Sequence, residues 1–453
     1  MHLKLGSLLA AAISIAVVQN ASAADLPTKG PIYKAPPAPV FDWTGFYLGG
    51  YVGVAASQSR SLDPIGSQFG DGTLQHTGYG FTGGGTIGYN WQLGNALFGN
   101  KWVVGLEGDI GYFDASHRAV DWNDPDLAYN AKTSWLATVR GRIGWADGPN
   151  FGYVTGGYAA LNLKDVNADP TTGIEASSNQ TRSGWAIGTG TETMLGGGWS
   201  AKAESLYVDV GRGDTLANPS NVFIIQTDKH RYQTQRFGLN YSFGAKTGPL
   251  PQTNWNGFYA GVTAGTTLSS VSGTGDDLTV ARNGEIGNNA AGFLIGGQAG
   301  YNWMLGPRAV VGLEGDFSYF SSKQSNLNFF NSSTITDVDA SWIGTLRGRL
   351  GYSTGPALLY VTGGAAWVNV TDTFNWGTVV VSKQTLDGWT IGGGIETVFS
   401  GNWTMKSEYL FVDAGHGDLL VDPTGGAISM NHKFHLFRTS LVYRFSGNPL
   451  SGL

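Results

Sequence analysis

Hydrophobic and polar positions alternate with a period of two in many short stretches of this chain. Residues 104–109 read Val-Gly-Leu-Glu-Gly-Asp, and the same run recurs at 311–316. In a strand, Leu106 lies on one face, whereas Glu107 and Asp109 lie on the other. Two carboxylates cannot face a dry protein core without partners, but they can face the lumen of a membrane barrel whose apolar side contacts lipid. The pattern therefore predicts strands of a transmembrane β-barrel.

One predicted strand, residues 132–147, carries an aromatic residue near each end of its apolar face. Trp135 and Trp145 stand ten positions apart, and Trp342 and Tyr352 repeat this spacing later in the chain. Ten residues at a rise of about 3.3 Å, tilted by about 40°, span roughly 25 Å along the membrane normal. This is about the height of the apolar band of an outer-membrane barrel, so we expect the four residues to lie in its aromatic girdles.

The chain repeats itself, and the repeat defines its organisation. Trp-x-Gly-Phe-Tyr occurs at 43–47 and 255–259, and Gly-Tyr-Asn-Trp occurs at 88–91 and 300–303. The spacing between matched segments varies, which places insertions and deletions where loops are expected. The sequence is therefore interpreted as a tandem duplication.

Each copy divides into eight strand-like segments. In the first copy they are 44–58, 76–92, 101–118, 132–147, 150–166, 179–195, 198–212 and 230–243. Short connections follow the even-numbered segments, and long polar ones follow the odd-numbered segments, near 59–75, 119–131, 167–178 and 213–229. This alternation is typical of outer-membrane barrels, in which short turns are periplasmic and long loops are extracellular.

The ends of the chain and the junction between the copies suggest their own roles. The first residues show an apolar run after His2 and Lys4 and a small-residue cleavage site before Ala24, as in a signal peptide. The five prolines that follow favour an extended tether. The predicted segments are a signal peptide (1–23, cleaved after Ala23), a periplasmic tether (24–42), barrel repeat 1 (43–243), a linker (244–254), barrel repeat 2 (255–445) and a C-terminal tail (446–453).

The polar faces of the predicted strands carry four cations and four anions per copy. In the first copy these are Glu107, Asp109, Arg140, Arg142, Glu192, Lys202, Glu204 and Arg236. In the second copy they are Glu314, Asp316, Arg347, Arg349, Glu396, Lys406, Glu408 and Arg438. Charges inside a narrow, side-chain-filled barrel must pair, whereas a wide aqueous pore does not require their cancellation. The balance favours an all-β fold of two tandem eight-stranded antiparallel barrels, with one sixteen-stranded barrel as the alternative.

Composition narrows the chemistry of the 453-residue chain. The net charge is -6 with no basic block, which argues against a nucleic-acid partner, and the absence of cysteine removes disulfides and thiolate metal sites. Paired carboxylates can perform acid–base chemistry, but no nucleophile and base stand at a recognisable spacing, so we expect no enzyme. No cofactor or metal is expected either. A haem or metal site built from His416, His432 and His435 is conceivable, but Arg212 replaces His416 in the other copy, and solvated loop histidines are favoured.

Three features together resemble a known family. They are an Ala-Asp-Leu-Pro start at 24–27, the Trp-x-Gly-Phe-Tyr opening strand, and closing strands that end in Phe243 and Phe445. The chain resembles the alphaproteobacterial outer-membrane surface-antigen family of porin-like or immunogenic proteins, akin to the OmpA-type eight-stranded barrel. The resemblance implies an outer-membrane location, insertion by the barrel-assembly machinery and a C-terminal Phe signal. Two departures are the tandem copy and the eight residues that follow Phe445.

These observations favour a structural or cell-surface role in the bacterial outer membrane, without catalysis. The expected partners are outer-membrane lipid, the assembly machinery during insertion, and host or ligand molecules that touch the extracellular loops. A porin-type channel for passive diffusion of small solutes is the first alternative. A surface protein that binds haem or another ligand is the second.

Overall fold

The computed structural model describes residues 41–62, 73–95, 99–120, 128–169, 174–217, 224–244, 246–277, 282–327, 335–375, 378–423 and 426–445. The predicted signal peptide, the C-terminal tail and the tether up to residue 40 lie outside the described residues. Strands make up nearly all of the described part, where no helix is long and apolar enough to cross a membrane.

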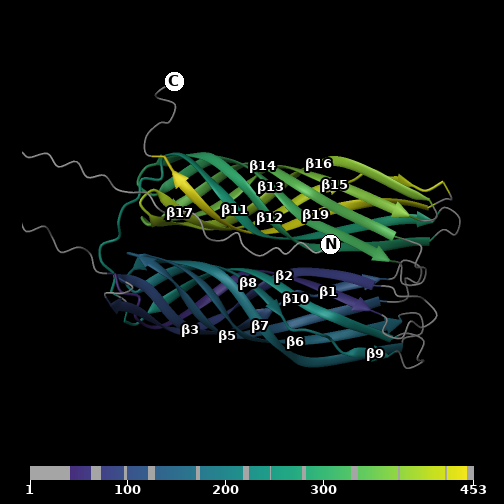
Figure 1. The fold of residues 1–453 in the computed structure, drawn as a ribbon, viewed down its shortest axis with the longest axis horizontal. Coiled ribbons are helices and arrows are strands. Elements are labelled where there is room, and N and C mark those ends of the chain that lie inside the picture. The colour runs from purple at the N-terminus through teal and green to yellow at the C-terminus, as the bar shows by residue number, and fades with distance from the viewer. Residues whose placement is uncertain are drawn as a thin grey trace, which may run out of the picture. The chain divides into compact units, whose positions relative to one another are not determined.

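The first repeat is a closed barrel of eight principal strands (Figure 1, purple to teal). Its strands are β1 (Gly45–Leu62), β2 (Thr73–Asn95), β3 (Gly99–Phe113), β4 (His117–Val120), β5 (Ala128–Asp147), β6 (Asn150–Asp169), β7 (Ile174–Gly196), β8 (Trp199–Asp209), β9 (Thr215–Ala217) and β10 (Ile224–Ser242). The antiparallel order is β1-β2-β3-β5-β6-β7-β8-β10, and β10 pairs with β1 to close the ring. The short strands β4 and β9 only extend β5 and β10 at the long-loop end.

The second repeat closes in the same way (Figure 1, green to yellow). Its strands are β11 (Gly257–Asp277), β12 (Arg282–Leu305), β13 (Ala309–Leu327), β14 (Ile335–Ser353), β15 (Ala357–Asn375), β16 (Val379–Ser400), β17 (Trp403–His416), β18 (Leu420–Val421) and β19 (Gly426–Arg444). Tyr259 of β11 is opposite Arg444 of β19, just as Tyr47 of β1 is opposite Ser242 of β10. Because each repeat pairs its own first and last strands, the two-barrel fold is confirmed and the sixteen-stranded alternative is wrong.

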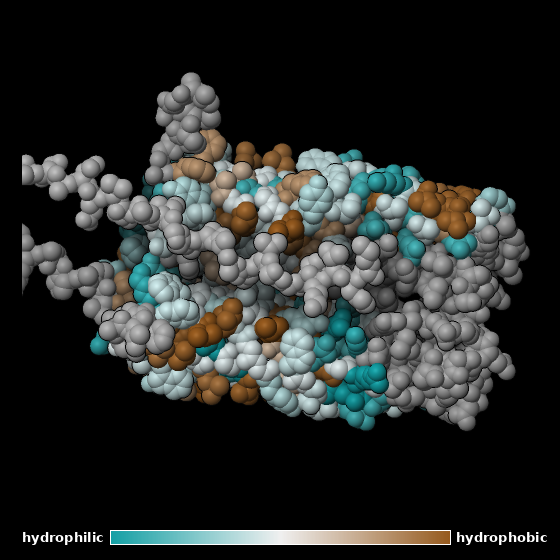
Figure 2. Space-filling view, in the orientation of Figure 1, coloured by the Kyte–Doolittle hydropathy of each residue, from teal (hydrophilic) through white to brown (hydrophobic). Residues whose placement is uncertain are grey.

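Alternation along the strands separates an apolar outer wall from a polar lumen. On β5, Val139 and Ile143 are exposed on the outer wall, whereas Arg140 and Arg142 are buried inside. Figure 2 shows apolar side chains, in brown, on the outer walls of the strands. Each barrel therefore presents to its surroundings the residues that a lipid phase accepts and encloses those that it excludes.

Strand pairing runs further into the predicted loops than the polarity pattern indicates. The predicted loop 167–178 shrinks to the break between β6 and β7, which end and begin at Asp169 and Ile174. Antiparallel pairing needs only backbone partners, so a hairpin continues beyond the apolar band with polar residues on both faces. The predicted boundaries were wrong here because polarity marks the end of the membrane and not the end of the strand.

Candidate functional site

The candidate site is the charged layer inside each barrel. All sixteen predicted lumen residues are buried, with exposures of 7% or less. In the first barrel they come from five strands, β3, β5, β7, β8 and β10, and in the second barrel from the five corresponding strands. Asn90 of β2 and Tyr47 of β1 contribute neutral partners. Ion pairs join the eight members of each set into one network with no net charge.

Arg140 is the centre of the network in the first barrel. Its Nη2 lies 2.8 Å from Glu107 Oε1, 2.8 Å from Asp109 Oδ2 and 3.0 Å from Glu204 Oε1. Strand register supplies part of this arrangement, because Glu107 is directly opposite Arg140 on the neighbouring strand. The contact with Glu204 crosses the lumen from β5 to β8, so a single guanidinium ties opposite walls together.

The remaining cations extend the network along the lumen. Lys202 donates to both carboxylate oxygens of Glu107, at 3.0 and 2.9 Å. Arg142 Nη1 lies 3.1 Å from Glu192 Oε2, and Arg236 Nη1 lies 2.9 Å from Asp109 Oδ1. Because these groups are removed from water, their mutual pairing is what makes burying them tolerable.

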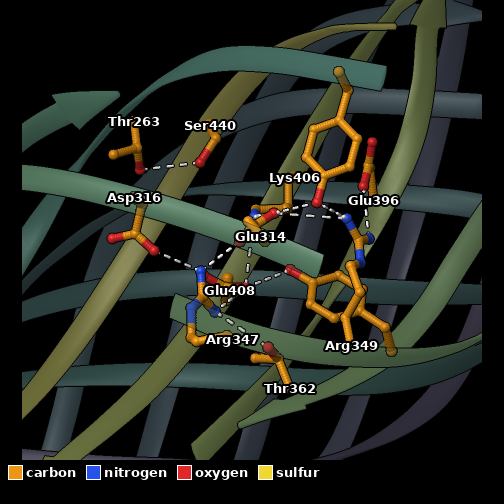
Figure 3. Close-up of polar contacts among 12 residues, drawn as sticks. Thr263, Glu314, Asp316, Arg347, Arg349, Thr362, Glu396, Lys406, Glu408 and Ser440 are labelled. Carbon is orange, nitrogen blue, oxygen red and sulfur yellow. Dashed lines mark hydrogen bonds and ion pairs between the residues drawn. The ribbon is translucent and has the colours of Figure 1, made fainter. Parts of the chain in front are cut away.

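The second barrel repeats the arrangement around Arg347 (Figure 3). Arg347 pairs with Glu314, with Asp316 at 2.7 Å and with Glu408 at 3.1 Å. Lys406 Nζ donates to both oxygens of Glu314 at 2.8 Å. Arg349 Nη2 lies 2.8 Å from Glu396 Oε2, and Arg438 bridges Asp316 and Glu408. Most of these contacts occur in both copies, which shows that the network is a property of the repeat.

Two tyrosines per barrel complete the network and were missed by the sequence analysis. Tyr47 donates to Glu107 at 2.8 Å, and Tyr153 donates to Glu204 at 2.9 Å. Arg142 also stacks on both rings, with its guanidinium carbon 4.6 Å from the Tyr47 ring centre and 5.2 Å from that of Tyr153. Tyr259 and Tyr360 take the same roles in the second barrel. The sequence did contain an indication of these tyrosines, because each one recurs at the matched position of the other copy.

Apolar side chains fill the lumen on both sides of the charged layer. Toward the long-loop end of the first barrel, Phe113, Leu136 and Leu161 belong to one buried cluster. Toward the short turns, Trp43 and Phe151 belong to another, with ring centres 5.4 Å apart. The second barrel has matching clusters, one around Val368 and Leu410 and one around Trp255 and Leu358. The polarity pattern did not predict these layers, which make each lumen a packed interior.

The histidines considered for a haem site do not converge. His432 is buried in the lumen, with Nε2 3.1 Å from Asp372 Oδ2, and His230 is buried in the first barrel with Nε2 3.7 Å from Asp165 Oδ2. His435, three positions from His432, lies on the opposite face of β19, where it contacts the Tyr409 hydroxyl at 2.8 Å. The expectation of solvated histidines is wrong for His432 and His435, both of which are buried, whereas His416 is exposed.

The four proposed girdle residues lie on the outer walls. Trp135 and Trp145 are partly exposed on β5, as is Trp342 on β14, and Tyr352 is 48% exposed. Other outward aromatic residues accompany them, and Trp102 packs edge-on against Trp145 at 5.6 Å. Aromatic rings in such positions suit the boundary between apolar and polar membrane zones.

The sequence model of the outer membrane protein beta-barrel domain family matches residues 9–243 and again 244–445. The chain belongs to this family. It carries the family domain twice, which agrees with the two closed barrels, and it is an outer-membrane protein.

Named relatives of this family come from alphaproteobacteria. The 31 kDa outer-membrane immunogenic protein of Brucella melitensis is 35% identical over 210 residues, which cover 44% of this chain and 86% of the relative. The 22 kDa outer membrane protein of Rhizobium leguminosarum bv. viciae is 31% identical over 176 residues, covering 39% of this chain and 68% of the relative. The predicted resemblance to alphaproteobacterial surface antigens is confirmed.

Among solved structures, Neisserial surface protein A is 14% identical and covers 42% of this chain and 97% of its own, with a TM-score of 0.24. The toluene transporter TodX of Pseudomonas putida is 10% identical and covers 91% of this chain and 92% of its own, with a TM-score of 0.27. Both TM-scores are too low to inform function.

Proposed function

We propose that this protein has a structural and cell-surface role in the outer membrane and that its two barrels do not conduct solutes. The observation that carries the proposal is the filled lumen. In it, a network of equal numbers of cations and anions lies between two apolar layers. An open diffusion pore requires a continuous aqueous path, and the side chains packed across the described part of the lumen argue against such a path. The long loops at one end of each barrel form the surface that the cell presents.

The network supports a structural role and not an acid–base one. Glu107 contacts three cations, and Glu204 contacts Arg140 and the Tyr153 hydroxyl. A carboxylate that acts as a general acid or base must reach a substrate proton, but these groups are buried and already bound to cations. We infer that they hold the strands together, and that insertion of each barrel proceeds through the barrel-assembly machinery.

Planar-bilayer recording of the purified, refolded full-length protein tests the closed lumen. A general porin in the same lipid serves as the control that shows that the recording detects an open pore. We expect the porin to give large, stable openings and this protein to give none at matched amounts of inserted protein. Large, stable openings from this protein would refute the proposal and favour passive diffusion.

A further inference from the structure

Two lysines lie directly opposite each other on the outer wall of the first barrel, near its long-loop end. Lys132 of β5 pairs in register with Lys164 of β6. Both are exposed, while their chain neighbours Thr133 and Asp165 are buried, so both side chains point outward. Side chains directly opposite each other on neighbouring strands are about 5 Å apart at Cβ, and like charges in such positions repel.

Neither lysine forms an ion pair with any residue that the structure describes. Two other outward cations of this barrel are matched: Arg231 lies 3.3 Å from Asp209, and Lys101 lies 2.8 Å from Asp147. The lysine pair therefore concentrates two positive charges that the described part of the protein does not balance, which is the arrangement that attracts an external anion.

The pair lies beyond the outward-facing Trp135, toward the long loops. Lys132 is three positions beyond Trp135 toward the loops, about 10 Å along the strand. Between them and the apolar band lies a polar ladder on the outer wall. In it, Ser134 donates to Asn162 at 2.8 Å, and Asn162 donates at 2.9 Å to Asn179, which stands in register with Lys164 in the lysine row. Below this ladder, the same three strands expose Val139, Tyr158 and Trp185.

The second barrel provides an internal comparison. Its polar ladder is kept, since Ser341 donates to Asn369 at 2.9 Å. The row above it differs: Asp339, Thr371 and Lys383 stand in register where the first barrel has Lys132, Lys164 and Asn179. The first row carries two positive charges, whereas the second carries one of each sign. The fold therefore does not require the lysine pair.

We propose that Lys132 and Lys164 form a docking site for a phosphate-bearing lipid headgroup of the outer leaflet. The position beyond the aromatic girdle selects a membrane lipid as the occupant, because the acyl chains would then lie along the exposed apolar residues of β5, β6 and β7. A phosphate between two ammonium groups relieves their repulsion, and the amides of the ladder below are hydrogen-bonding groups for the rest of the headgroup. The proposal does not depend on whether the lumen conducts.

Native mass spectrometry of lipid retention tests the site in the full-length protein. Refolded protein is mixed with diphosphoryl lipid A or with phosphatidylcholine, and the lipid that stays bound is counted. The test variant is Lys132→Ala/Lys164→Ala, and the matched control is Lys383→Ala, which removes an exposed lysine from the corresponding row of the second barrel. All of these positions are on the outer surface, and the heat-dependent shift in gel mobility verifies that each variant has folded.

We expect the wild-type protein and the Lys383→Ala variant to retain lipid A, and the double variant to bind it about thirtyfold more weakly, because each basic side chain at an anionic surface adds a few-fold to binding. The Lys132→Arg/Lys164→Arg variant should keep the affinity. Equal retention by the wild type and the double variant would overturn the proposal. So would an equal loss in Lys383→Ala, which would indicate general surface charge, or displacement of the lipid by excess inorganic phosphate, which would indicate a free-phosphate site.

Discussion

At the scale of single residues, cross-strand register places much of the interior charge. Glu107 is opposite Arg140, and Glu314 is opposite Arg347 at the equivalent position of the second barrel. Glu204 and Arg236 are also directly opposite each other. Register thus brings opposite charges together on neighbouring strands, and the long arginine side chains then reach across the lumen to further partners.

Replacing Arg140 with Ala should strongly destabilise the first barrel. The substitution leaves Glu107, Asp109 and Glu204 buried without their shared cation, and breaking a buried ion pair in this way costs about 3–5 kcal/mol. Urea unfolding of the refolded full-length protein measures the change. Arg231→Ala is the matched control, because Arg231 and Asp209 pair on the outer wall, and its expected effect is below about 1 kcal/mol. Equal effects of the two substitutions would contradict a structural network.

The sequence could predict which residues face inward but not which of them meet. A period of two gives the face of each strand, so the sequence alone identifies both charged sets. The height of a residue in the barrel depends on the stagger between strands, which a single sequence does not reveal. The contact between Arg140 and Glu204, and those of Tyr47 and Tyr153 with their carboxylates, were therefore not predictable.

At the scale of elements, the inward-facing glycines of the strands make room for the large interior side chains. Gly88 of β2 faces the Tyr47 ring, and a Cβ placed on it would lie 2.2 Å from the Tyr47 hydroxyl oxygen and 2.6 Å from the backbone oxygen of Leu106. Gly300 holds the same position against Tyr259 in the second barrel. These glycines are needed because they leave space for the side chains of the network, not because they make the strands flexible.

Gly88→Ala should destabilise the first barrel by about 1–3 kcal/mol, the usual effect of forcing extra volume into a packed interior. Gly85→Ala on the same strand is the control, because Gly85 is exposed and its added Cβ would meet only the Gly49 carbonyl oxygen, at 3.9 Å. Urea unfolding should show no loss of stability for Gly85→Ala. If the two substitutions behave alike, close packing at Gly88 is not the cause.

A β-bulge explains why the lysine pair was not visible in the sequence. On β5, Thr133 is opposite Leu163 and Leu136 is opposite Leu161, so Ser134 and Trp135 share one partner position. The extra residue reverses the alternation. Counting back from outward-facing Trp135 without a bulge would turn Lys132 toward the lumen, whereas the structure exposes it on the outer wall.

At the scale of the whole molecule, each repeat closes by pairing its own first and last principal strands. The pairing of β1 with β10 and of β11 with β19 leaves neither barrel dependent on the other for backbone hydrogen bonds. The charges of each eight-residue network likewise cancel within its own barrel. The repeated sequence motifs and the balanced charges predicted that each repeat would close separately. When a complete barrel unit is duplicated, each copy keeps the strands that close it.

A shortened protein that ends at Phe243 should therefore fold as a barrel without the second repeat. Refolded into detergent, it should give the strand-rich circular dichroism of the full chain and a gel mobility that changes on heating. The corresponding second repeat, starting at residue 244, serves as the companion sample. Failure of both halves to fold under conditions in which the full chain folds would show that the repeats need each other.

Self-closure also determines how such a chain can change in length over evolution. Adding strands to one large ring alters its circumference, and the tilt and stagger of every existing strand must readjust. Adding a ring that closes on itself disturbs no hydrogen bond already made. A gene of this kind can gain or lose a whole unit in one recombination step, so the number of units can vary while the architecture of each stays fixed.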